Sequence, residues 1–185
     1  MTLLKNRKIA ILITAIVAIL ATLLGVRGSL NRLARDVEAM FVSGVYLEDE
    51  KFTQPGIYAH LENRAASALA LATALESYPE LKAETENLLT ARRGLMNANT
   101  IKDRYAANES LQQAFTALEE KAGKLSLSGR DKETLEMHAS DFSGARAAIM
   151  DSRYNAAAAS YLDGVSILAR ILRPFVFVKP PQAFA

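Results

Sequence analysis

Cysteine and tryptophan are both absent from this 185-residue chain, and only two histidines occur. The lack of cysteine excludes disulfides, iron–sulfur ligation, thiolate zinc sites and a cysteine nucleophile. Neither His60 nor His138 has a second histidine four residues away or belongs to an HExxH motif, so no metal site is predicted. We therefore expect neither a bound metal nor a cofactor.

Other catalytic signatures are also missing. The serines form no GxSxG or SxxK motif, and no glycine-rich phosphate loop is present. Adjacent carboxylates such as Asp49 and Glu50 fit a solvated helix surface better than acid–base chemistry. The net charge of +2, from 22 basic and 20 acidic residues, gives no general attraction to nucleic acid. We expect a protein that is not an enzyme and has no nucleic-acid partner.

Long uncharged stretches are rare, and the exception is residues 9–26, IAILITAIVAILATLLGV. As a helix, these residues rise about 27 Å, close to the roughly 30 Å of bilayer hydrocarbon. A buried core helix and a cleaved signal peptide are the alternatives. The run is longer than a signal-peptide core, and residues 24–27 carry bulk and charge at the positions where a cleavage site needs small side chains. We predict a single-pass cell-membrane anchor after a basic flank of residues 1–8.

Basic residues lie on both sides of the predicted anchor, which leaves both orientations open. They are Lys5, Arg7 and Lys8 before it and Arg27, Arg32 and Arg35 after it.

Aromatic residues are only 7% of the chain, and no strand-like alternation of useful length occurs. Apolar residues instead recur every three or four positions, which predicts an all-α fold. The expected helices extend from the anchor to about Asp49 and over 57–97, 101–123 and 131–172. The second helix carries a narrow apolar stripe that consists of Ile57, Leu61, Ala65, Ala68, Ala72 and Leu75.

Two interruptions affect these helices. Tyr78-Pro79 either kinks the second helix or starts a new one, and we expect a kinked continuation. Pro174 is expected to end the fourth helix. Together the periodicities predict an antiparallel, up-and-down four-helix bundle over residues 27–173 that continues the anchor, with an irregular aromatic and proline-rich tail over 174–185. Ala156 and Ala159 are expected to face another helix.

The fourth helix contains Arg153-Tyr154-Asn155, then Tyr161, and is followed by an apolar run and Phe175-Val176-Phe177-Val178-Lys179. This order resembles the LemA family of bacterial membrane proteins, whose members end with an RxYN…YN segment, an apolar stretch and an FxFK-type tail. Further similar landmarks are Leu61-Glu62-Asn63-Arg64 and Ala107-Asn108-Glu109. The chain departs from the family pattern at Leu162, where the second YN would have asparagine. The resemblance implies an anchored four-helix bundle without assigned catalytic activity.

The motif residues are expected to act in folding. Adjacent helical residues point about 100° apart, so Tyr154 can pack on a neighbouring helix while the Asn155 amide binds a helix end or loop backbone. A ligand site is the alternative interpretation.

The tail offers a candidate membrane contact. Arg170, Arg173 and Lys179 bracket Phe175 and Phe177, and cations beside aromatic side chains suit an interface with anionic headgroups. In the alternative, these phenylalanines cap the protein's own core.

An anchor and a helical bundle without chemistry favour a structural, interaction or membrane-organising module, and the family resemblance implies that it belongs to the bacterial envelope. Its expected partners are the lipid bilayer and a membrane protein or a second copy of the chain. A sensor or regulatory partner of a membrane protease or kinase, binding a ligand between helices, is the alternative function.

Overall fold

The computed structural model describes residues 7–185 and is about 75% helical. Residues 1–6, which include Lys5 of the predicted basic flank, lie outside the described part of the chain. The described chain divides into two compact units, which differ from the predicted bundle and tail. One unit comprises residues 7–38 and Ala157–Pro181, and the other comprises Ala39–Ala156 and Gln182–Ala185.

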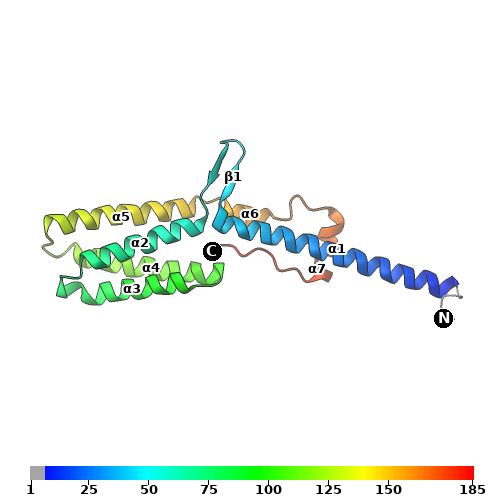
Figure 1. The fold of residues 1–185 in the computed structure, drawn as a ribbon, viewed down its shortest axis with the longest axis horizontal. Helices are drawn as coiled ribbons and strands as arrows, with labels where there is room; N and C mark the ends of the chain where they lie inside the picture. Colours follow the sequence, from blue (N-terminus) through cyan, green and yellow to red (C-terminus); the bar gives the residue numbers. More distant parts are fainter. Residues whose placement is uncertain (1–6) are drawn as a thin grey trace. The chain divides into compact units, whose positions relative to one another are not determined.

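Helix α1 (Arg7–Ser43) contains the apolar segment and continues beyond it (Figure 1). Burial within the protein begins at Leu30 and recurs at Ala34 and Val37, a spacing that marks one helix face. The predicted end near Asp49 is wrong. The helix ends at Ser43 because Gly44 adopts a left-handed conformation with φ 88°, and its N–H donates to the Met40 carbonyl at 2.9 Å.

A β-hairpin that the sequence did not predict follows α1. Strand β1 (Val45–Leu47) pairs antiparallel with β2 (Phe52–Gln54), which places Tyr46 opposite Thr53. Each strand has only three residues, too few for a period-two pattern to be recognised. Residues 45–47, which were predicted to continue the first helix, therefore form a strand instead.

The predicted second helix is in fact two helices that pack against each other. Helix α2 (Ile57–Ala74) is followed by the short 3₁₀ helix η2 (Pro79–Leu81) and by α3 (Lys82–Asn97). Tyr78 is extended, with φ −99° and ψ 102°, as expected for a residue before proline. The chain therefore leaves the helical direction at this point, and the predicted kinked continuation is wrong.

Helices α4 (Ile101–Ala122) and α5 (Gly129–Met150) complete the packing: α4 lies against α3, and α5 lies against α2 (Figure 1). The hydroxyls of Thr100 and Ser128 cap these two helices by accepting the N–H groups of Asp103 and Asp131. The whole predicted stripe of α2 is buried, as are its counterparts on α4, namely Asn108, Leu111, Phe115 and Leu118.

The predicted fourth helix is also interrupted. It ends at Met150, and shorter helices α6 (Tyr154–Ser160) and α7 (Ile167–Val176) follow. Pro174 does not stop the chain's helical course, because α7 continues through it to Val176. Ala156 and Ala159 are exposed rather than packed, and Ala158 is the buried alanine of α6.

Candidate membrane-contact surface

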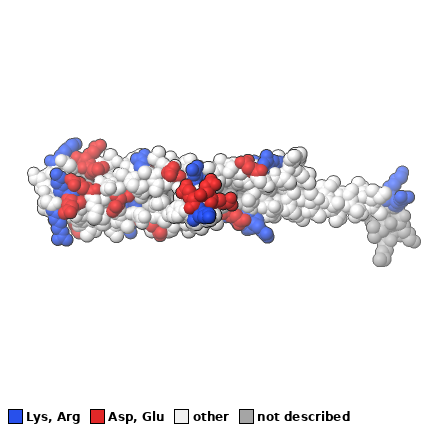
Figure 2. All heavy atoms as spheres, turned by 90° about the horizontal axis from the view of Figure 1, so that it is seen from above, with Lys and Arg blue, Asp and Glu red and all other residues white. Residues whose placement is uncertain are grey.

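The apolar part of α1 is long enough and apolar enough to cross a membrane. Its 18-residue window has a mean hydropathy of 2.9, and none of it is buried within the protein. Figure 2 shows this part of the helix without charged side chains. Because this segment is exposed, it differs from the core helix of a soluble domain, which is mostly buried. The residues of the amino-terminal helix thus form the first part of the surface.

Helix α7 forms the second part, in the same unit. The Ser166 hydroxyl caps its first turn by accepting the Ala169 N–H at 3.4 Å. The helix ends at Val176, after which Phe177 adopts a left-handed conformation with φ 51°. Helix α7 is therefore helical from Ile167 to Val176, and the rotation between successive residues in this range determines which side chains share a face.

Successive residues of an α-helix are rotated by about 100° around its axis, so the side chains of α7 lie on three faces. Ala169 and Val176 lie on the face that is buried in the protein. Arg170 and Arg173 lie on a basic face. The third face is apolar and exposed, and it is formed by Ile167, Leu168, Ile171 and Phe175. Phe177, just beyond the helix, is exposed to 85%.

The buried face of α7 packs on α1 at the end of its apolar segment. Val176 and Val178 form a buried cluster with Leu30, and Leu23 and Val26 pack against this cluster. The exposed apolar face of α7 therefore adjoins the last turns of the candidate span. Phe175 and Phe177, at 66% and 85% exposed, do not cap a core, so the structure contradicts that alternative for these two residues.

The three predicted basic residues have different surroundings. The Arg170 guanidinium donates to the backbone carbonyls of Leu162 and Asp163, with its shortest contact at 2.6 Å, and so holds the loop before α7. Arg173 lies over the Tyr161 ring, 5.8 Å from its centroid. Lys179 is exposed. Arg173 and Lys179 are therefore the cations best placed to meet an external anion.

The motif residues fall into different places. In the larger unit, the Arg153 N–H donates to the Gln54 side chain at 2.9 Å at the base of the hairpin. Tyr154 is fully buried, and its hydroxyl donates to the Gln182 carbonyl at 2.7 Å. The Asn155 amide binds the backbone of Phe184. Tyr161 belongs to the other unit.

Sequence reasoning missed the aromatic residues that surround the tail. The Phe184 ring lies 5.7 Å from Phe41 and 5.3 Å from Tyr105, and Phe41 also contacts Tyr154 edge-on at 5.5 Å. Such spacings are typical of stabilising aromatic pairs. The one available signal was Phe184 itself, an aromatic residue near the end of the proline-rich tail.

Arg64 is the second feature that the sequence did not assign. This side chain is fully buried, donates to Asn108 and Gln112, and stacks 3.9 Å above the Phe142 ring. Burial is the main cause that lowers the pKa of Arg64 to about 10, and the nearby Arg146 acts in the same direction. The group remains charged at neutral pH. No ion pair to it occurs among residues 7–185.

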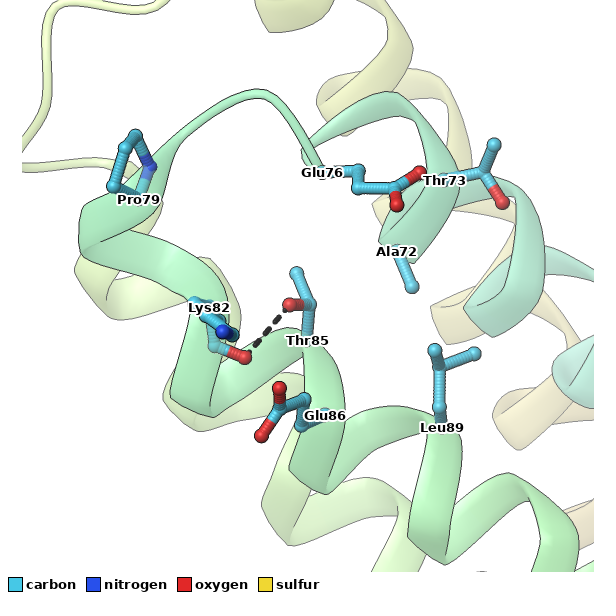
Figure 3. Close-up of a pocket in the computed structure, with 8 residues that line it drawn as sticks. All are labelled: Ala72, Thr73, Glu76, Pro79, Lys82, Thr85, Glu86 and Leu89. Atoms are coloured by element: carbon cyan, nitrogen blue, oxygen red, sulfur yellow. Dashed lines mark hydrogen bonds between the residues drawn. The ribbon is translucent and has the colours of Figure 1, made fainter.

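The grooves between helices carry little chemistry. Figure 3 shows one between α2 and α3, of about 460 Å³, in which the Thr85 hydroxyl donates to the Lys82 carbonyl at 2.9 Å. His60 and His138 line another groove, between α2 and α5, and burial lowers the pKa of His60. Within residues 7–185, no three histidine, aspartate or glutamate side chains are grouped so that they could hold a metal ion.

The geometry thus provides a candidate membrane surface, a held tail and a buried cation. Comparisons of the chain with protein-family models, with curated proteins and with solved structures found no match.

Proposed function

We propose that this chain is a non-catalytic membrane protein that α1 anchors in the bilayer and that acts as a structural, interaction or membrane-organising module. The observation that carries the proposal is the apolar segment of α1, because 18 aliphatic-rich residues that the protein leaves largely exposed are favourable in lipid. The resemblance to the LemA family points to the bacterial envelope.

In this proposal, α2 to α5 form an up-and-down four-helix bundle. Support comes from the packing of α2 on α3 and α5 and of α3 on α4. The surface of these helices carries both signs of charge (Figure 2). Such a surface is suited to contacts with other envelope proteins or with a second copy of the chain, rather than to a single polyanionic partner.

The groove of Figure 3 favours a second candidate function, in which a ligand between α2 and α3 would make the chain a sensor or regulator of a membrane protease or kinase. Purification of the full chain from detergent-solubilised membranes separates the two functions. A stoichiometric protease or kinase supports the second function, whereas self-association or lipid alone supports the first.

Carbonate extraction of membranes tests the anchor. We expect the full-length chain to stay in the membrane fraction. The Val17→Arg variant with Ile13→Arg should weaken insertion, because each arginine near the centre of a span disfavours it by roughly 2.5–3.5 kcal/mol. Met137→Arg, at an exposed position of α5, is the matched control and should not change the fractionation. Release of the unaltered full-length chain into the soluble fraction would refute the anchor.

A further inference from the structure

We propose that α7 and the residues up to Lys179 form a second membrane contact, which lies in the plane of the bilayer interface and binds anionic lipid headgroups. This inference rests on the proposed anchoring by α1. It adds a lipid-binding surface with residues of its own. The experiments below test this surface separately from the span.

The first argument is the amount of apolar surface that the protein leaves uncovered. Ile167 and Ile171 are 78% and 61% exposed, and Phe175 and Phe177 are more than half exposed. Ile167, Ile171 and Phe175 lie on the exposed apolar face of α7, and Phe177 follows the end of the helix. Singly exposed apolar residues are ordinary, but a contiguous group of this size marks a surface for lipid or for another protein.

The second argument is depth. The buried face of α7 contacts Leu23, Val26 and Leu30, where the uncharged run of α1 gives way to Arg27. When residues 9–26 span the hydrocarbon, these contacts place α7 at the boundary between acyl chains and headgroups. An amphipathic helix at this level can bury its apolar face without crossing the bilayer. Continuity with the span thus favours lipid over a protein as the occupant.

The third argument is charge. Residues 157–181 contain three basic side chains, Arg170, Arg173 and Lys179, and one acidic side chain, Asp163. Arg170 is engaged with backbone carbonyls, half-buried Arg173 lies over the Tyr161 ring, and exposed Lys179 lies two residues beyond the exposed Phe177. Cations next to an inserted apolar face complement phosphate-bearing headgroups and strengthen binding to anionic membranes.

The chain has no tryptophan, so one introduced indole reports a single position in the full-length protein. Ile171→Trp, Phe175→Trp and Phe177→Trp each place the indole at an exposed site, and Met137→Trp on α5 is the matched control. Each variant is reconstituted in phosphatidylcholine vesicles with or without phosphatidylglycerol. Lipids brominated at different depths and aqueous iodide serve as quenchers, and circular dichroism verifies folding.

We expect blue-shifted emission at positions 171, 175 and 177, with the strongest quenching by bromine near the glycerol end of the acyl chains. The control should be quenched by iodide alone. Emission like that of the control at all three positions would overturn the proposal. Shielding from both lipid bromine and iodide would also overturn it, because a protein would then cover the face.

A double variant tests the preference for anionic headgroups. It combines Arg173→Gln and Lys179→Gln in the Phe175→Trp protein, which is the parent for comparison. Phosphatidylglycerol should increase insertion of the parent, and the double variant should lose roughly five-fold in the insertion constant for each cation. Equal insertion of parent and double variant in phosphatidylglycerol vesicles would refute binding to anionic headgroups. Release of the full-length chain into the soluble fraction by carbonate, in contrast, would refute the anchor.

Discussion

The side-chain amide of Asn155 holds the backbone of Phe184 through two hydrogen bonds: Nδ2 donates to the Phe184 carbonyl at 3.0 Å, and the Phe184 N–H donates to Oδ1 at 2.8 Å. An asparagine amide can satisfy the donor and the acceptor of one residue in this way. The contact orders a segment that has no secondary structure of its own and places the Phe184 ring between Phe41 and Tyr105.

Replacing Asn155 by alanine should therefore destabilise the fold. Both backbone groups of Phe184 lose their partner, which corresponds to about 1–3 kcal/mol. Thermal unfolding monitored by circular dichroism measures the effect. The exposed Asn63→Ala is the control and should stay within about 0.5 kcal/mol. An Asn155→Ala chain as stable as the unaltered protein would show that the tail contributes nothing to folding.

Gly44 and Gly94 should respond in opposite directions to alanine. A Cβ at Gly44 would overlap the Gln54 carbonyl oxygen, and its φ of 88° is unfavourable for alanine, so we expect a loss of at least about 2 kcal/mol. Gly94 lies inside α3 with nothing within 4 Å of an added Cβ, so alanine there should stabilise by about 0.5–1 kcal/mol. Denaturant unfolding compares the two; a similar loss in both variants would contradict the prediction.

Asp131 should make stability depend on pH in the acidic range. Hydrogen bonds from the hydroxyls of Ser128 and then Tyr78 lower the pKa of Asp131 below its usual 3.8. The unfolded state then binds the proton more readily, so the stabilisation is complete above about pH 4 and is lost as the pH falls through the lowered folded pKa.

Tyr78→Phe tests this dependence. The variant should be less stable at neutral pH, and the difference from the unaltered chain should shrink in unfolding measurements below about pH 4. Tyr46→Phe, on the exposed face of the hairpin, is the control and should follow the unaltered chain. A Tyr78→Phe difference that is constant from acid to neutral pH would contradict the proposed role of Asp131.

Arg64 and Asn108 should be coupled energetically. Arg64→Met leaves the buried Asn108 oxygen without its donor, and Asn108→Leu removes an acceptor from a buried cation, so each should destabilise by about 1–3 kcal/mol. The double variant removes both polar groups and should be more stable than the sum of the single losses predicts. A double-mutant cycle with strictly additive losses would show that the two side chains act independently.

Local sequence patterns predicted the helical class of the chain, the long apolar segment and the buried face of α2. These features depend on neighbours within one or two helical turns, so periodicity and composition suffice to predict them. The resemblance to a family of membrane proteins also came from local motifs. The division of the predicted second helix could not be decided in this way, because Pro79 is compatible with a kink and with a new first turn.

Contacts between residues far apart in the chain decide which apolar residues remain exposed and which polar residues meet. Arg64 reaches Asn108 over a separation of 44 residues, and Asn155 reaches Phe184 over 29. On α7, the sequence alone does not tell that Val176 is buried while Phe175 is open. Both are apolar and adjacent on a short helix. Their burial differs because α1 covers one face of that helix and leaves the other uncovered.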